Sequence, residues 1–282
     1  MPSDRPRRAS TAAAVDPVPM AARDLRPVQS AAPATLFVFS AAGAEEEEQQ
    51  EDDGGAPSFN PTYLKIRGVD FRTESSSNHA SPTGSLPFLI DETPVEGGGS
   101  GGRQLPRTVP TNKLAQWIDE TAASSVNTVD LDAADVRAFT SLLDTSIRDA
   151  WLYAMYVDPT NLHTITTPRY THATPLWPVT AVIGAQMRNA ALASIRQSHV
   201  QPTGRALYAA AAEAWDALST LLDEEQWFFG ARDAGVFDAG VFAYAHLMLA
   251  SGGELAAVVN RHENLVAHEA RVRRKWYPGS SL

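Results

Sequence analysis

One stretch constrains the fold more than any other: residues 227–250, which read WFFGARDAGVFDAGVFAYAHLMLA. Over residues 236–249 only Asp238 and His246 interrupt a run that is apolar on nearly every face. A helix of that kind must be covered by other helices or by lipid. At about 14 residues it is shorter than the roughly 20 that a bilayer span needs. We therefore predict a central helix with others packed around it, and Asp238 near its start suits the positive end of the helix dipole.

The composition sets the broad limits. The 282 residues allow two modest domains, or one domain with disordered additions, and 44% apolar residues permit a substantial core. The chain has no cysteine, which excludes disulfides, thiolate catalysis and cysteine metal sites. Its formal charge of −10 is mostly local, because residues 45–53 hold seven acidic side chains and leave about −3 elsewhere. No basic stripe alternates with aromatic residues, which argues against nucleic-acid binding.

Two segments read as disordered. Residues 1–33 are predicted to be a polar tail: their arginines suggest a mitochondrial presequence, but Asp4, Asp16, Asp24 and several prolines break the acid-poor amphipathic helix that such a peptide needs. Residues 41–57 are an acidic low-complexity insert that cannot bury enough apolar surface to order itself. We expect a solvated loop there rather than a docking arm.

Residues 34–118 are predicted to form an α/β domain. We expect strands at residues 35–39, 70–74 and 86–90 and helices at residues 60–69 and 113–119. A turn region at residues 75–85 precedes the third strand, and a glycine-rich loop at residues 96–104 follows it. In the first helix Asn60 suits the N-cap, Pro61 the first helical position and Gly68 the end. Pro87 opens the third strand, because proline cannot donate to a central ladder and belongs at a strand start or bulge.

The rest of the chain, residues 119–282, is predicted to be an all-helical domain. Apolar residues repeat there at spacings of three and four, which is typical of helices packed by one face. The expected helices lie at residues 132–156, 176–195, 207–222, 236–249 and 254–276. An α/β half followed by helices alone gives an α/β plus all-α fold.

This combination resembles the glutathione-transferase fold, in which a thioredoxin-like half precedes a helical half built on one very apolar central helix. In that fold a cis-proline precedes the third strand, and Pro87 holds the matching position. Central helices there commonly begin with a Ser/Thr-x-x-Asp capping box, whereas Gly235 stands three residues before Asp238 here. Glycine can serve as an N-cap with modest loss.

Within that superfamily the chain resembles the metaxins. The likeness covers roughly residues 35–277 and is specific over residues 227–277, where it follows the metaxin run from "FFG" through "DA-VF-Y" to "NLV" and into the last helix. The matching positions, with Pro87, are Trp227, Phe228, Phe229, Gly230, Asp238, Phe242, Tyr244, Asn264, Leu265, Trp276 and Tyr277.

The resemblance implies a non-catalytic subunit of the mitochondrial outer-membrane machinery (the SAM complex) that recognises and inserts β-barrel precursor proteins. It implies a location on the cytosolic face, with a membrane-embedded β-barrel subunit, a second metaxin-like subunit and precursor signal segments as partners. The chain shows no membrane anchor in its sequence, so it resembles the peripheral, receptor-type subunit of fungi. No cofactor is expected.

A catalytic site is weighed against this. A transferase needs a hydroxyl or thiol near the end of its first strand to stabilise the glutathione thiolate. Ser40 is the candidate, but the acidic tract after it disfavours an anion, and a turn role is favoured. Tyr63 is displaced into the following helix as a packing aromatic. Such enzymes also carry an acid–serine pair where Thr111 and Asn112 stand, so we expect no glutathione site.

The histidines do not form a metal motif. His262, Glu263 and His268 resemble a zinc-protease helix, but that motif requires histidines four residues apart on one face. We expect partly exposed helix histidines at these positions. We expect His246 to be a hydrogen-bonded core residue.

Two further alternatives stay open. Arg271, Arg273, Arg274 and Lys275 could meet anionic lipid headgroups, although cations that complement a helix C-terminus are the simpler interpretation. Trp276 and Tyr277 could lie at a membrane interface or close the last core layer. The competing functions are a glutathione-dependent transferase and a transferase-fold binding module of a soluble complex.

Overall fold

The computed structural model of the chain describes residues 34–39, 60–76, 81–82, 86–92, 106–122, 133–168 and 176–278. The tail expected over residues 1–33, the acidic insert over 41–57 and the glycine-rich loop over 96–104 lie outside these residues, as does Ser40.

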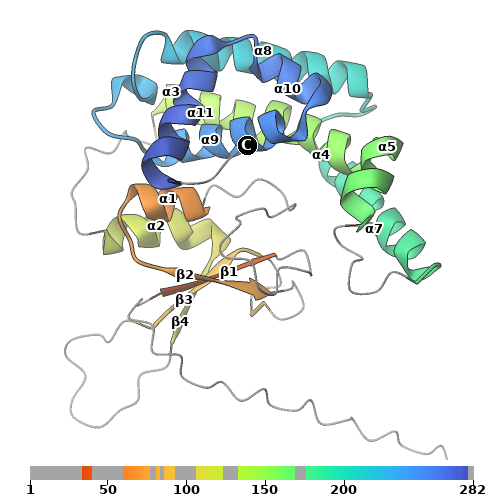
Figure 1. The fold of residues 1–282 in the computed structure, drawn as a ribbon, viewed down its shortest axis with the longest axis horizontal. Coiled ribbons are helices and arrows are strands. Elements are labelled where there is room, and N and C mark those ends of the chain that lie inside the picture. Colours follow the sequence, from red (N-terminus) through yellow and green to blue (C-terminus); the bar gives the residue numbers. More distant parts are fainter. Residues whose placement is uncertain are drawn as a thin grey trace, which may run out of the picture. The chain divides into compact units, whose positions relative to one another are not determined.

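Four strands of the described chain form one sheet (Figure 1). They are β1 (Ala34–Phe39), β2 (Arg72–Ser76), β3 (Phe88–Asp91) and β4 (Arg107–Pro110), in the order β2-β1-β3-β4. Strand β1 runs parallel to β2 and antiparallel to β3, and β3 is antiparallel to β4. A parallel pair needs a crossover connection, and α1 (Asn60–Ile66) lies between β1 and β2 in the chain.

Helices α1 and α2 (Thr111–Thr121) lie on one face of this sheet (Figure 1). Their buried side chains and those of the strands make one core, which contains Leu36, Tyr63, Leu64, Leu89, Val109, Leu114, Trp117 and Ile118. The end of α1 agrees with the sequence prediction: Gly68 takes the left-handed conformation (φ 67°) and donates its N–H to the Lys65 carbonyl.

The strand β4 was not predicted. It is four residues long, and its two β-branched residues, Thr108 and Val109, lie between the exposed Arg107 and Pro110. A run of two such residues is too short to mark a strand in the sequence. It pairs with β3 alone, with Val109 opposite Leu89. The pairing with β3, more than the strand propensity of its own residues, therefore determines that β4 forms.

The helical half follows the predicted order, with short additional helices and two interrupted ones. Its helices are α3 (Ala134–Leu142), the π-helix η1 (Leu143–Ile147), α4 (Arg148–Tyr156), α5 (Pro159–Asn161), the π-helix η2 (Leu162–Thr166), α7 (Val179–Ile195), α8 (Gly204–Leu222), the 3₁₀ turn η3 (Phe228–Gly230), α9 (Val236–Ser251), α10 (Gly253–Val259) and α11 (Glu263–Trp276). The long helix predicted over residues 132–156 is therefore interrupted by a π segment. The α5–η2 pair occupies what reads in the sequence as a threonine-rich connector.

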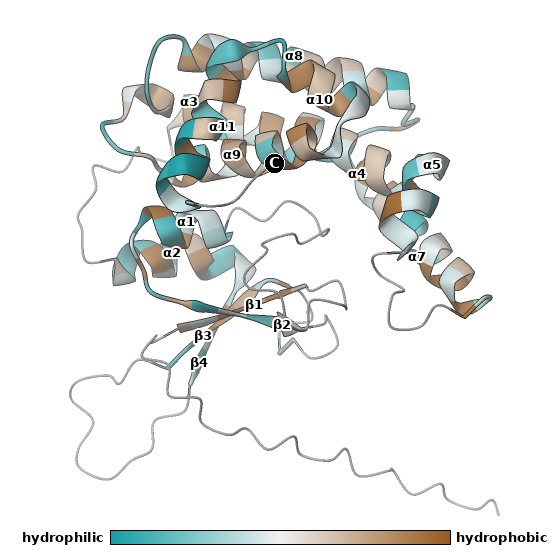
Figure 2. Cartoon of the chain, viewed as in Figure 1, coloured by the Kyte–Doolittle hydropathy of each residue, from teal (hydrophilic) through white to brown (hydrophobic). Residues whose placement is uncertain are grey.

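The prediction of a covered central helix is confirmed. In α9 the side chains from Phe237 to Ala245 are buried, as is Met248. The helix contacts α10, α11, η1 and α1, so neighbours from both halves cover its apolar faces. Figure 2 shows the apolar colouring of α9 among these neighbours.

The prediction of one helix over residues 254–276 is wrong. The helix is interrupted between Asn260 and His262. His262 has extended backbone angles and immediately precedes α11. Both α10 and α11 contact α9 and α8. Because each segment keeps its own apolar face, the periodicity continues in both and does not reveal the break.

The two halves meet where α1 contacts α9 and α11. Ala239 of α9 is buried in the core of the α/β half, and Val236 packs against it. The boundary expected at residue 118 falls inside α2, which ends at Thr121. We propose that the domain boundary lies after this helix, since Trp117 and Ile118 belong to the sheet's core.

Candidate functional site

The position where a transferase would hold glutathione lies between β3 and the start of α2. The Leu86–Pro87 peptide bond is cis, as the resemblance implies. The Thr111 hydroxyl donates to the Pro87 carbonyl, so this side chain already has a partner within the fold. The first turn of α2 contains no acidic residue and Asn112 is exposed. The described residues therefore offer no carboxylate here for a peptide ammonium group.

Tyr63 is a packing residue, as predicted. Its side chain is buried in the α/β core, and its hydroxyl donates to Oδ1 of Asp119. Burial, reinforced by this hydrogen bond, raises the pKa of the Tyr63 hydroxyl well above its ordinary value. Arg67 approaches the same carboxylate at 3.2 Å. The phenol joins α1 to α2 and has no free oxygen facing a substrate.

The metaxin-like motif begins with a tight turn before α9. Phe229 and Gly230 are both left-handed (φ 60° and 62°), a conformation that favours glycine at the second position. The turn buries Trp227 and Phe228, and the Phe228 ring lies edge-to-face against Phe237 with centroids 5.0 Å apart. The aromatic run thus covers the start of the central helix.

Asp238 is the polar centre of this motif. Its carboxylate accepts the Gly235 N–H at 2.8 Å and the Phe228 N–H at 3.1 Å. The acidic half of a capping box is therefore present although Gly235 has no side chain to complete it. Nε2 of His268 lies 3.0 Å from Oδ1 of the same carboxylate. These contacts satisfy a buried charge in the way that buried charges require.

Of the three histidines, His268 is more buried than predicted, whereas His262 is partly exposed as predicted and His246 is only partly buried. His268 has no exposure at all and packs edge-to-face against Trp227 and Phe228; the expectation of partial exposure is wrong for it, because α11 lies against the turn before α9. His262 precedes α11 and lies 3.1 Å from Asp216. His246 is hydrogen-bonded as predicted, with Nδ1 2.8 Å from Oε1 of Glu269.

Asn264 and Leu265 join α8 to α11. The Asn264 amide donates to the carbonyls of Ser219 (2.8 Å) and Asp223 (3.2 Å), and its oxygen accepts the Leu265 N–H. Leu265 is fully buried in the helical core. Tyr244 is also buried there, and burial raises the pKa of its hydroxyl above the ordinary value.

Tyr277 connects the helical half to α1. Its hydroxyl lies 2.8 Å from that of Thr62, and its ring stacks on Phe242 with centroids 5.6 Å apart. Lys65 lies over the same ring at 3.8 Å. Trp276 packs against Trp227 at 5.8 Å. Of the two roles left open by the sequence, the described contacts favour closing the core.

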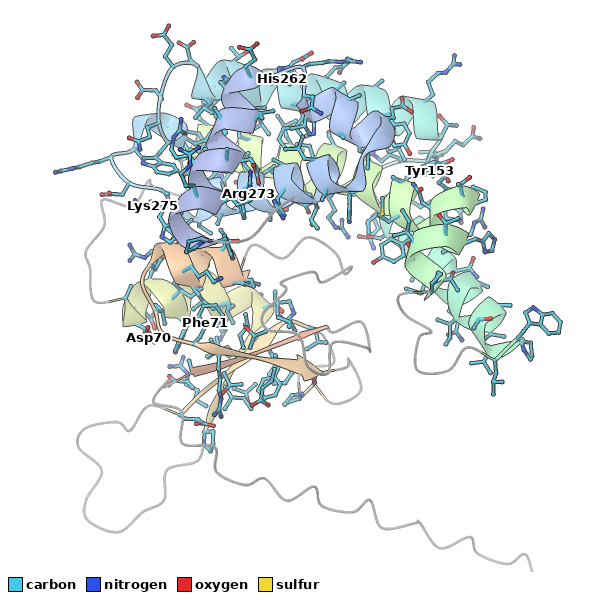
Figure 3. All side chains as sticks on the ribbon, viewed as in Figure 1. Asp70, Phe71, Tyr153, His262, Arg273 and Lys275 are labelled. Atoms are coloured by element: carbon cyan, nitrogen blue, oxygen red, sulfur yellow. The ribbon has the colours of Figure 1, made fainter. Side chains whose placement is uncertain are left out.

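Three of the four C-terminal cations, Arg271, Arg273 and Lys275, have partners within the fold. Figure 3 labels Arg273 and Lys275 on α11. Arg271 donates to the Gln226 carbonyl at 2.7 Å and Arg273 to Glu269 at 3.0 Å. Lys275 lies 4.5 Å from the Trp276 ring. These contacts stabilise the last turns of the chain and favour the structural interpretation of the basic cluster.

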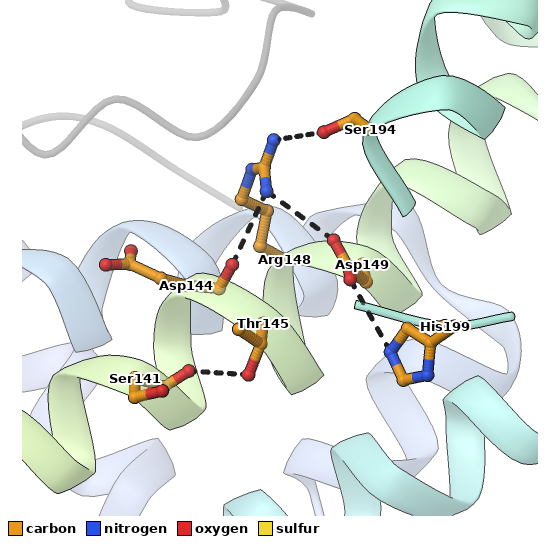
Figure 4. Close-up of polar contacts among 7 residues, drawn as sticks. All are labelled: Ser141, Asp144, Thr145, Arg148, Asp149, Ser194 and His199. Carbon is orange, nitrogen blue, oxygen red and sulfur yellow. Dashed lines mark hydrogen bonds and ion pairs between the residues drawn. The ribbon is translucent and has the colours of Figure 1, made fainter. Parts of the chain in front are cut away.

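A second buried carboxylate, Asp149 on α4, was missed by sequence reasoning (Figure 4). Its oxygens lie 3.5 Å from the Arg148 guanidinium and 3.5 Å from Nε2 of His199. Arg148 also donates to Ser194 of α7 at 2.5 Å. Burial raises the pKa of the Asp149 carboxyl, and the neighbouring Arg148 and His199 offset this only in part. No motif spacing links residues so far apart in the chain.

Two negative findings apply to the described residues alone. No cluster of three or more histidine and acidic side chains there has a geometry fit for a metal ion. None of the helices drawn from those residues combines the length and hydropathy that a bilayer crossing requires.

Comparison with known proteins decides the relationship. Residues 61–188 match the Tom37 family model, described as an outer mitochondrial membrane transport complex protein, and residues 211–272 match the glutathione S-transferase C-terminal domain. Metaxin-1 of Mus musculus is 25% identical over 228 residues, which are 77% of this chain and 68% of that protein. The match to Homo sapiens metaxin-1 has the same identity and spans 46% of the human protein. The chain is thus similar to the metaxins and to the Tom37 family.

The structural comparison confirms the fold class. The β-etherase LigF of Sphingobium aligns with a TM-score of 0.54 at 14% identity, over 86% of this chain and 96% of that enzyme. At that identity the likeness concerns the fold alone. The chain has a glutathione-transferase-like fold, with an N-terminal thioredoxin-like half and a C-terminal helical half.

Proposed function

We propose that this chain is a non-enzymatic, peripheral subunit of the mitochondrial outer-membrane machinery that recognises and inserts β-barrel precursors. The match of residues 61–188 to an outer-membrane transport family carries the proposal, because those residues include α1, β3 and α2, where a transferase would bind its peptide. The resemblance to metaxin-1 over most of the chain supports the same role.

The state of the transferase position supports a non-enzymatic role. Thr111 bonds to the Pro87 carbonyl, and Tyr63 bonds to Asp119. The Thr111 hydroxyl therefore holds the start of α2 to the residue before β3, and the Tyr63 hydroxyl holds α1 to α2. A thiolate needs a free donor near it, and these two groups do not offer one.

The sheet offers an edge for an extended precursor segment. β2 and β4 are the outer strands of the described sheet. Proline has no N–H to donate, and β4 ends in Pro110 whereas β2 has no proline. Strand addition uses main-chain hydrogen bonds along such an edge. Within the proposed function, β2 is thus the edge that pairs with the signal segment, with exposed Thr73 and Glu74 on it.

The deciding experiment is a mild-detergent pull-down of the tagged chain from mitochondria, with partners identified by mass. Recovery of a membrane β-barrel subunit and a second transferase-like subunit at moderate salt is the expected result. Recovery of the chain alone, together with glutathione-resin binding and conjugation activity, would overturn the proposal in favour of a transferase. Recovery with soluble partners only would favour a binding module of a soluble complex.

A photo-crosslinking amino acid at Glu74 of β2 tests the edge, with the same group at exposed Arg107 of β4 as the matched control. We expect a precursor signal peptide to crosslink at position 74 and not at 107. Crosslinking at 107 alone would assign the other edge.

A further inference from the structure

A long part of the helical half contains no acidic residue. Between Pro159 and Ala212 the sequence has neither aspartate nor glutamate but has four arginines, at positions 169, 188, 196 and 205. This segment has a formal charge of +4, which leaves −14 for the remainder of a chain whose total is −10. Its positive charge is therefore concentrated in one region of an otherwise acidic protein.

The exposed apolar side chains lie in the same segment. Every large apolar side chain that is exposed in the described part of the chain falls within it: Ile165, Leu176, Trp177, Val179, Val182 and Val200. Four of these surround the start of α7, where Trp177 is 82% exposed, Leu176 68% and Val182 54%. We call Leu176, Trp177, Val179 and Val182 the apolar tip.

The tip belongs to a helix that the fold holds only in part. α7 contacts α4 and η2, and its buried residues are Gly184, Ala191 and Ile195, all in its middle and end. Gly184 lies so close to Thr167 that a Cβ there would be 3.1 Å from the threonine Oγ1. The helix is thus fixed beyond Gly184, and its first turns present apolar side chains outward.

The backbone of the tip is suited to an apolar environment. The Thr180 N–H donates to the Leu176 carbonyl, and the Val182 N–H donates to the Pro178 carbonyl. Pro178 itself has no N–H. Free backbone donors are what make a helix start costly to place in lipid, and these contacts reduce their number.

We propose that the apolar tip inserts into the headgroup layer of an anionic membrane, with the exposed Arg188 and Arg196 at the lipid phosphates. The proposal deepens the proposed function and rests on it for the identity of the membrane. Tryptophan is enriched at membrane interfaces, helices that lie there bury Trp, Phe and Leu, and basic residues near an anionic leaflet add to the attraction.

The spacing along α7 fits this placement. Arg188 follows Val179 by nine residues, which at 1.5 Å per residue is about 14 Å of helix. Interfacial apolar groups lie roughly 5–10 Å below the headgroup boundary. With the tip at that depth, the exposed side chains of Arg188 and then Arg196 are at or above the phosphates and not in the hydrocarbon.

The charge pattern favours lipid over a protein partner as the occupant. At the C-terminus Arg271, Arg273 and Lys275 have carbonyl, carboxylate and aromatic partners in the fold, so we favour α7 as the surface for anionic headgroups. Among the four side chains of the tip, the Trp177 indole is the one that could form a hydrogen bond with a protein.

The test is flotation of the purified full chain with vesicles of phosphatidylcholine, with and without phosphatidylserine. We expect binding only to the anionic vesicles, a loss of tenfold or more in Trp177→Ser/Val182→Ser, and a smaller loss in Arg188→Glu. Val200→Ser is the matched control, because it removes a 94% exposed apolar side chain of the same segment away from the tip. It should bind like the unmodified chain.

Because the chain has no cysteine, a single introduced cysteine can carry a label that reports how deeply its position lies in the membrane. A polarity-sensitive fluorophore on Trp177→Cys should shift to the blue on anionic vesicles and be quenched by nitroxide lipids, whereas the same label on Val200→Cys should not. Equal behaviour of the two labels would overturn the proposal, as would unchanged flotation of the double variant.

Two outcomes separate this inference from the proposed function. If the chain does not bind vesicles but the double variant loses its membrane partner in the mitochondrial pull-down, a protein covers the tip and the lipid proposal is wrong. If vesicles bind through the tip but no membrane β-barrel is recovered, the proposed function fails and the lipid contact stands.

Discussion

Nε2 of His268 lies 3.0 Å from Oδ1 of Asp238, and both side chains are withdrawn from solvent. The two residues come from α11 and the first turn of α9. The same carboxylate receives the N–H groups of Phe228 and Gly235. One side chain thus fixes the aromatic turn, the start of the central helix and the last helix together.

We predict that Asp238→Ala destabilises the chain by about 3–5 kcal/mol, because it leaves buried partners without an acceptor. Asp238→Asn keeps one acceptor oxygen and should cost less. Urea unfolding monitored by circular dichroism measures both, with the exposed Asp233→Ala as control. A change below about 1 kcal/mol in Asp238→Ala would show that the carboxylate does not organise this region.

We predict that replacing Asn264 with aspartate destabilises the fold. Asn264→Ala loses the bonds to the Ser219 and Asp223 carbonyls, at about 1–3 kcal/mol. Asn264→Asp places a charged acceptor against those carbonyls and should cost more. Unfolding free energies rank the variants, and hydrogen exchange should accelerate in the last turn of α8. Asn264→Asp more stable than Asn264→Ala would contradict the donor role.

Tyr277 is predicted to couple the two halves in two separable ways. Tyr277→Phe removes the contact with Thr62 and should cost about 1 kcal/mol. Tyr277→Ala also removes the stack on Phe242 and the Lys65 contact, for a total of about 2–4 kcal/mol. Thr62→Val should match Tyr277→Phe, and the double variant should add little if the two hydroxyls act as a pair.

The buried Asp149 predicts a pH dependence. Its folded-state pKa is raised by burial, so its contribution to stability is complete below the unfolded value of 3.8 and is lost as the pH rises through the folded value. The unfolding free energy of the unmodified chain minus that of Asp149→Asn should therefore fall as the pH rises from about 4 toward neutrality. Urea titrations across this range check the sign, with exposed Asp233→Asn as the control. A difference that grows with pH would show that Arg148 and His199 outweigh burial.

The sequence by itself determined those features that depend on neighbours in the chain. The apolar run over residues 236–249 predicted that α9 is buried, and Asp238 indicated where that helix begins. Gly68 indicated where α1 ends. These are properties of spacing, capping and backbone freedom, and they act within a few residues.

Only the tertiary structure decided the features that depend on residues far apart. β4 forms because its backbone pairs with β3. The partner of Asp238 is His268, which lies 30 residues away in the chain. The contrast between α7 and α9 shows the reason most clearly. Both helices are rich in apolar residues, but α9 is covered by helices from both halves while the start of α7 stays exposed. An apolar composition indicates that a helix must be shielded from water. Only the packing of segments distant in the sequence determines whether the fold itself buries it.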